Sequence, residues 1–546
     1  MKLEKYASVL TPACAWLATA AATPVWAQEA APAPAVAAAA DPTPAAADTA
    51  PRPPAPAAAP LRGAAPVDTA LPLAAIPKAA KPIWQGHASA LATAQQIGSY
   101  AVDAFGATAP DSAQAFGRLR LGISLDSGPS TAATLKGGFA AEIASGSWSD
   151  APSLFGDRAP GSDTAKTLPA EAWLGVAKGK VADVRAGLQA SHWGLGLLAN
   201  DGKIHDLGWF SVPRIGDRVL RGAITVSPWR GKDTPLAGLS VSLAMDDVLA
   251  DDLELPGDEG RQTVAALRWH AAADRWLGFY FAGRTQQHTS GRRMDANAFD
   301  LTGDLTLRPA FGSLRLQGEA VLITGTTTLA PTPEYPTHDI EQFAVLLRAT
   351  AKGTDGWLAV LDAGWFSGDQ SLDDGKIQGF RADPNFQMGM LLFPQVLAWQ
   401  SGRARLGASD PSLVGRPADD LERLATGGSV GSAIAVFPKA GWNALPWLEV
   451  YAGALLAASP SPLTDPRASR TQTGGEAVNF LGKTPDGIWL GTELAGGFRL
   501  KFAAPRQAGQ LVIGAEAAHL LPGGVLAGLD AVSGLRVTAA WLPEAE

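Results

Sequence analysis

The feature that most constrains this chain is a repeated, strict alternation of apolar and polar residues. In 299–308 (FDLTGDLTLR) the apolar or small residues occupy the odd positions and the charged or hydroxylated residues occupy the even ones. The segments 314–322 (LRLQGEAVL) and 490–502 (LGTELAGGFRLKF) sort in the same way. Because successive side chains of a β-strand point to opposite faces, each segment predicts a strand with one apolar and one charged face.

Two all-β architectures produce this pattern, a soluble sandwich or barrel and a membrane barrel. Strands of about ten residues suit a tilted crossing of a bilayer, and many polar-face positions hold Gly, Ala, Ser or Thr. Tryptophans recur near the expected strand ends, as the interfacial girdles of a membrane barrel require: Trp229, Trp276, Trp357, Trp365, Trp447, Trp489 and Trp541. We therefore predict an antiparallel transmembrane β-barrel of about 16–18 strands, with charged faces toward the lumen.

The expected strands follow from alternation between turns that are rich in Gly, Asp, Asn and Pro. The gaps 395–429 and 459–486 are interpreted as extracellular loops or as constrictions folded into the lumen. The expected strands are 117–126, 135–148, 170–178, 182–190, 215–228, 236–246, 261–271, 275–288, 297–308, 313–325, 340–352, 356–368, 386–394, 430–438, 446–458, 488–502, 510–520 and 533–542.

Residues 1–27 are typical of a secretory signal peptide. Lys2 and Lys5 precede an uncharged run that ends in Val25-Trp26-Ala27. Cleavage there would remove Cys14, the single cysteine, so we expect no disulfide and no thiolate site. The alternatives are an uncleaved anchor and, less favoured by the sequence around Cys14, a lipoprotein.

Three further parts follow the signal peptide. Residues 28–82 are almost entirely Ala and Pro and are expected to form a disordered linker. Residues 83–116 are expected to be a short periplasmic segment, with a possible amphipathic helix within 86–105. The barrel is expected to occupy 117–546.

Composition narrows the classes of function. Charged residues make up only 18% of the chain and the net charge is −8, which argues against a nucleic-acid partner held through phosphates. No stretch of about 18 apolar residues follows the signal peptide, so we expect no helical membrane span.

The alternation also predicts which charged side chains face the lumen. Basic residues outnumber acidic ones there although the whole chain is negative, and arginine suits contacts with carboxylate or phosphate. A mild preference for anionic solutes follows, unless the charges merely pair with one another and brace the wall. The pore-lining candidates are Arg118, Arg120, Arg185, Arg221, Arg268, Arg284, Arg308, Arg315, Glu319, Arg348, Asp362, Glu493, Arg499 and Lys501, with Arg536, Asp126, Asp183, Asp304, Glu449 and Glu516 in addition.

Signals for catalysis and metal binding are weak, and we expect no enzyme, no cofactor and no metal. Gly427-Gly428-Ser429-Val430-Gly431 matches the G-x-S-x-G pattern, but an apparent strand follows where a nucleophile elbow needs a helix. None of the seven histidines has a convincing partner by spacing. The acidic stretch from Asp246 to Glu259 could bind calcium, but a solvated loop is the favoured interpretation.

The stretch 181–202 (VADVRAGLQASHWGLGLLANDG) resembles a signature of Gram-negative outer-membrane barrels of the alginate-export type. The matching residues are Arg185, Gly187, Gln189, Trp193, Gly194 and Gly196. The resemblance implies an 18-stranded barrel with an arginine-lined channel for an acidic polysaccharide. Leu188, which precedes Gln189, departs from the Gly-Arg-Gln core of that signature, and the chain lacks a terminal aromatic residue.

Taken together, the sequence predicts a porin-like or exporter-like channel in the outer membrane that passes small polar, possibly anionic or saccharide, solutes. Its partners would be outer-membrane lipid and the solutes, with no nucleic acid and with the oligomeric state left open. One alternative is a structural or adhesive barrel with a plugged lumen, and another is an outer-membrane hydrolase.

Overall fold

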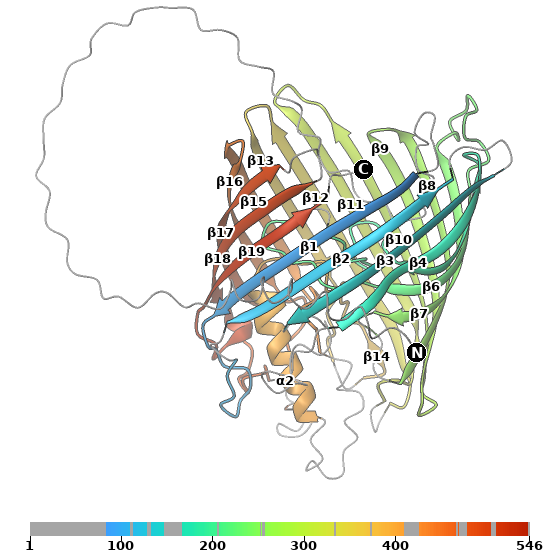
Figure 1. The fold of residues 1–546 in the computed structure, drawn as a ribbon. Coiled ribbons are helices and arrows are strands. Elements are labelled where there is room, and N and C mark those ends of the chain that lie inside the picture. The colour runs from blue at the N-terminus through green and yellow to red at the C-terminus, as the bar shows by residue number, and fades with distance from the viewer. Residues whose placement is uncertain are drawn as a thin grey trace, which may run out of the picture. The chain divides into compact units, whose positions relative to one another are not determined.

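A computed structural model describes residues 83–109, 113–127, 133–146, 166–204, 207–251, 253, 257–331, 335–371, 374–408, 425–465, 468, 478–503 and 509–543. The predicted signal peptide and linker lie outside these residues. Eighteen antiparallel strands form a closed barrel (Figure 1). They are β1 (Ile83–Ile97), β2 (Gln114–Asp126), β3 (Thr134–Gly146), β4 (Lys166–Lys178), β5 (Ala182–Ala190), β6 (Arg218–Val226), β7 (Leu239–Ala250), β8 (Asp258–Ala272), β9 (Arg275–His288), β10 (Arg293–Leu307), β11 (Gly312–Thr327), β12 (His338–Gly353), β13 (Trp357–Phe366), β15 (Ile434–Leu445), β16 (Leu448–Ala458), β17 (Trp489–Ala503), β18 (Gln510–Pro522) and β19 (Val532–Leu542).

Each barrel strand pairs with its neighbours in sequence, and β1 closes the ring against β19, for example Leu91 opposite Ala540. β13 pairs directly with β15. The two-residue β14 (Lys376–Ile377) therefore stands outside the ring and pairs in parallel with β12. Closure leaves no strand edge unpaired, which is the condition for a β-structure to lie in hydrocarbon.

The alternation of side chains has the polarity of a membrane barrel. On β10, Asp300 is 1% exposed and its neighbour Leu301 is 49% exposed; on β17, Glu493 is 0% exposed and Leu494 is 49% exposed. A water-soluble barrel would bury the leucines and expose the carboxylates. The predicted fold class and the outward direction of the apolar face are confirmed.

Exposed tryptophans mark both ends of the barrel wall. Trp357, the first residue of β13, and Trp447, in the turn between β15 and β16, lie at one end of the barrel, and Trp365 and Trp489 lie at the other. Trp276, predicted to belong to a girdle, instead stacks on the Arg268 guanidinium at 4.8 Å, because its position on β9 shares the inward face with Tyr280.

The predictions for 83–116 are wrong, because β1 occupies 83–97, where a helix was expected, and the barrel begins at residue 83. Between Ala88 and Ala94 the outward positions of β1 hold only alanine, whereas the inward positions include Leu91 and Thr93. The strand therefore lacks the apolar face that revealed the others, and its few large apolar residues have an accidental helical spacing.

The predicted strand 386–394 is also wrong. This apolar run leads into a π-helical turn, η1 (Leu392–Leu397), which is followed by α2 (Ala398–Ala408). Its side chains, including Met388 and Phe393, are buried. One missed strand and one false strand thus offset each other in the predicted number. None of the helices in the described residues is long and apolar enough to cross a membrane.

The two ends of the barrel differ in their connections. One end, which we call the short-turn end, carries the tight turns 179–181, 273–274, 354–356 and 446–447. The first residue of β1 and the last residue of β19 lie at this same end. At the opposite end, which we call the long-connection end, longer connections join β1 to β2, β3 to β4, β5 to β6, β13 to β15 and β16 to β17.

If the outer face lies in lipid, a charge near the middle of an outward strand face is costly. Leu301→Arg should lower the free energy of unfolding from a phospholipid bilayer by about 2–4 kcal/mol, whereas Leu307→Arg, at the end of the same strand, should cost about 0–1 kcal/mol. Denaturant titration of the refolded protein in vesicles measures both values. Equal effects of the two substitutions would argue against a lipid-facing surface.

Candidate functional site in the barrel interior

The segment 191–217, between β5 and β6, folds into the lumen and is held by carboxylates of the opposite wall. Glu319 on β11 accepts the backbone N–H groups of Leu195 and of Leu197, the latter at 3.2 Å. The Trp193 indole N–H donates to Asp300 on β10 at 3.1 Å. Two wall carboxylates therefore fix the start of the segment.

A glycine makes this close approach possible. Gly194 has φ +57, and a Cβ added there would stand 2.5 Å from the Glu319 carboxylate. A larger residue at this position would be strained in the backbone and would collide with the anchor. Gly194 belongs to the signature found in the sequence, and its role here is to let Glu319 reach the loop.

We call 191–217 the first inserted segment. Its far part is held by β16–β18. Glu516 accepts the Phe210 N–H at 3.0 Å and the Tyr451 hydroxyl at 2.7 Å. Arg499 donates to the carbonyls of Leu207 and of Gly208, the latter at 2.6 Å. Phe210 has φ 63, which is rare for a bulky residue and persists only where the surroundings enforce it. The segment therefore crosses the lumen from one wall to the other.

A second inserted segment, 378–408, lies against the wall near β17. The Glu493 carboxylate accepts three consecutive backbone N–H groups, from Met390 at 2.5 Å and from Leu391 and Leu392 at 2.9 Å each. Three donors compensate the burial of one carboxylate. The apolar side chains that follow, Phe393 among them, join the buried apolar cluster inside the barrel.

The two inserted segments are joined to each other. The Val212 N–H donates to the Gln387 side-chain oxygen, and the Gln387 amide donates back to the Val212 carbonyl, both at 2.9 Å. Arg214 donates its backbone N–H to Asn385 at 2.6 Å. Burial lowers the pKa of the Arg214 guanidinium to about 10, so the group stays charged at neutral pH, and it donates to the Gly427 carbonyl at 2.5 Å. The inserted segments thus behave as one body.

The charged side chains of the wall pair with one another, in most cases across neighbouring strands. Arg348 and Lys439 share Asp362, at 2.5 and 2.7 Å. Further pairs are Arg185–Asp183 at 2.6 Å, Arg221–Asp246 at 2.7 Å, Arg536–Glu516 at 2.5 Å, Arg120–Glu171 at 2.5 Å, Lys501–Glu449 at 3.1 Å, and Arg118–Glu142, Arg284–Asp251 and Arg315–Asp304. This arrangement matches the bracing alternative that the sequence left open.

The pore-lining candidates, with the exception of Arg308, lie on the inward faces of their strands. Arg308 follows the last residue of β10, precedes Pro309, and is exposed in the turn 308–311, so the alternation no longer defines its direction. Glu319 and Glu493 lie inward but hold inserted segments. Arg268 lies between the rings of Trp193 and Trp276, at 4.9 and 4.8 Å.

Sequence reasoning missed several partners of these groups. Asp246 was interpreted as part of an acidic loop, but it lies on β7 and binds Arg221 and Gln262. Asp251 pairs with Arg284, so these two carboxylates are not arranged for calcium. The alternation within 239–250 could have placed Asp246 inward. The anchoring by Glu319 and Glu493 depends on contacts distant in sequence, for which no local signal exists.

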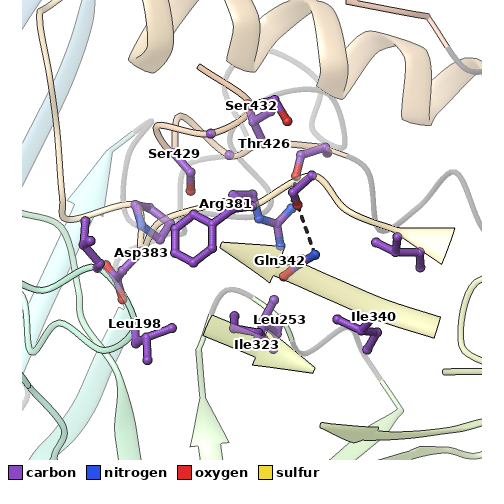
Figure 2. Close-up of a pocket in the computed structure, with 18 of the residues that line it drawn as sticks. Leu198, Leu253, Ile323, Ile340, Gln342, Arg381, Asp383, Thr426, Ser429 and Ser432 are labelled. Carbon is purple, nitrogen blue, oxygen red and sulfur yellow. Dashed lines mark hydrogen bonds between the residues drawn. The ribbon is translucent and has the colours of Figure 1, made fainter. Parts of the chain in front are cut away.

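A cavity of about 430 Å³ remains between the wall and the inserted segments (Figure 2). The cavity is lined by residues that come just after the ends of β5, β7 and β11, namely Ser191, Asp251 and Leu329. The cavity therefore lies toward the long-connection end. Ser429, from the G-x-S-x-G match, also lines it. The strand β15 follows this serine, and no helix does, which leaves the nucleophile-elbow interpretation without its scaffold.

Comparison with known proteins finds similar solved structures at low sequence identity. No protein-family model matches the chain, and no curated protein matches it. Similar solved structures include OccK11 (OpdR) of Pseudomonas aeruginosa, with 11% identity and TM-score 0.47 over 84% of this chain and 96% of that chain. OccK8 (OprE) of the same organism has 10% identity and TM-score 0.46, over 84% of this chain and 97% of that chain. OccAB4 of Acinetobacter baumannii has 9% identity and TM-score 0.46, also over 84% of this chain and 97% of that chain.

The anchoring by Glu319 can be tested directly. Glu319→Ala should speed hydrogen–deuterium exchange of peptides covering Leu195 and Leu197 by about 10- to 100-fold, because a hydrogen bond to a charged group contributes about 1.5–3 kcal/mol. Glu449→Ala is the matched control, because this wall carboxylate pairs with Lys501. Unchanged exchange in Glu319→Ala would show that other contacts fix the segment.

Proposed function

We propose that this chain is an outer-membrane channel for small polar solutes. The observation that carries the proposal is the inverted polarity of the closed barrel, with leucines outside and paired ions inside. A wall of this kind stabilises a polar interior within a membrane. The same architecture in bacterial outer membranes has its short turns and termini in the periplasm and its long loops outside, and we propose this orientation here.

The inserted segments set the size of the solutes. The first inserted segment crosses the lumen between β10–β11 and β16–β18, and the second is tied to it through Gln387 and through the Arg214 backbone N–H. A passage beside such a body admits small molecules and excludes polymers. The alternative of a plugged structural barrel has the same fold and differs only in passing nothing.

A weak preference for anions is part of the proposal. Arginines outnumber carboxylates among the inward candidates, but most of them lie against a carboxylate, as Arg315 does against Asp304. Paired charges leave little net field along a passage. An acidic polysaccharide, as the alginate-export resemblance implies, would depend on Arg185, which is already engaged by Asp183 and by the Trp173 ring at 4.6 Å.

Liposome swelling tests the channel. Vesicles that contain the protein should swell in arabinose and more slowly in glucose and in a disaccharide, because the inserted segments narrow the lumen. Leu307→Ala, on the outer surface, is the control and should keep the rates. Absence of swelling with every sugar, for protein that is folded by its mobility in unboiled gels, would establish the plugged alternative.

Ion selectivity tests the weak anion preference. In planar bilayers under a potassium chloride gradient, Arg315→Gln should shift the permeability ratio toward cations by up to about fivefold, because it uncovers Asp304 and a unit charge about 4 Å away in water is worth about 1 kcal/mol. The double variant Arg315→Gln/Asp304→Asn should return the ratio toward that of the original protein. Clear cation selectivity of the original protein would remove the anion preference.

A further inference from the structure

Ser429 is a buried hydroxyl that points into the cavity without a partner. It is 1% exposed, and its Oγ has no hydrogen bond among the described residues. Its backbone N–H is satisfied by the Thr426 carbonyl at 2.9 Å, and Figure 2 shows the side chain at the rim of the cavity. A buried polar group without a partner costs about 1–3 kcal/mol, and a molecule bound beside Ser429 would offset this cost by supplying the hydrogen bond.

The cationic groups at the cavity are already engaged by the protein. Arg284 forms an ion pair with Asp251. Arg381, in the middle of Figure 2, donates from its guanidinium to the Ala425 carbonyl at 2.5 Å. Recognition of an anion would require these groups to leave their partners.

The other carboxylates at the cavity are engaged as well. Each accepts a backbone N–H: Asp217 from Asn200 at 3.4 Å, Asp369 from Gln378 at 3.0 Å, and Asp383 from Asn385 at 2.7 Å. The lining therefore contains four aspartates, including Asp251, and two arginines, which also opposes an anion. A cation would have to compete for carboxylates that hold the loops in place.

Most of the remaining wall is apolar. Leu198, Leu253, Ile323 and Ile340 face the cavity together, as Figure 2 shows. Phe393 of the second inserted segment also lines it. A molecule that covers these side chains gains by removing apolar surface from water. A polyol would lose hydrogen bonds to water that this wall does not replace.

We propose that the cavity is a binding site for an uncharged amphiphile, a molecule with an aliphatic or aromatic body and one hydroxyl or amide group that hydrogen-bonds to Ser429. The proposal rests on the channel function and names the class of solute that pauses in its outer part. The volume of about 430 Å³ falls in the range of small-molecule pockets.

The test uses three probes that share one body and differ in charge: 4-phenylbutan-1-ol, 4-phenylbutyrate and 4-phenylbutylamine. Binding to the full chain in nanodiscs is measured by calorimetry, and Ala298→Phe, which fills the cavity from β10, supplies the background of partition into lipid. The alcohol should bind more tightly than either charged probe and than glucose. Ser429→Ala should lower the affinity for the alcohol by about three- to tenfold, which corresponds to the loss of one hydrogen bond. The affinities for the charged probes should not change.

Ser240→Ala is the matched control, since this hydroxyl donates to the Arg268 carbonyl and does not line the cavity. Mobility of unboiled samples in gels confirms that each variant is folded. Equal binding of the charged probes, full affinity in Ser429→Ala, or full affinity in Ala298→Phe would each overturn the proposal. If the alcohol binds but liposomes do not swell, the proposed channel function is wrong and the binding site stands. If liposomes swell but the alcohol does not bind, the binding site is wrong and the channel function stands.

Discussion

The interior of this barrel depends on wall carboxylates that bind the backbone N–H groups of inserted chain. Glu319, Glu493 and Glu516 each accept at least one such group while buried. An isolated buried carboxylate is costly, and N–H donors offset that cost only if they stay in place. The wall and the inserted segments therefore stabilise each other, and neither arrangement is favourable without the other.

The ion pairs between neighbouring strands follow from the same constraint. Asp362 is 1% exposed and lies between Arg348 and Lys439. Removing one partner of such a buried pair is strongly destabilising, although the pair itself contributes little net stability. The pairs also help to fix the register between neighbouring strands, because a slip by one residue would turn these charges toward lipid.

The sequence was sufficient for the barrel but not for its contents. Alternation in β10, β11 and β17 identified strands and their lipid-facing sides, because lipid and lumen impose opposite polarity on successive residues. β1 escaped this reasoning because its outward residues are alanines. The run 386–394 was mistaken for a strand because burial in the lumen and burial in lipid select the same apolar residues. The anchors Glu319 and Glu493 were recognised as inward, but their targets lie far away in sequence.

This division of roles has a consequence for selectivity. Charges that brace the wall are occupied, so the wall offers a passing solute few free ionic contacts. The cavity beside the inserted segments is lined mainly by apolar side chains, and the hydroxyl of Ser429, which follows the second segment, has no partner in the described residues. Discrimination between solutes then depends on the inserted segments, whose shape is set by Glu319, Glu493 and Glu516. Related barrels could keep the same wall and change their solute by changing only the sequence of the inserted chain.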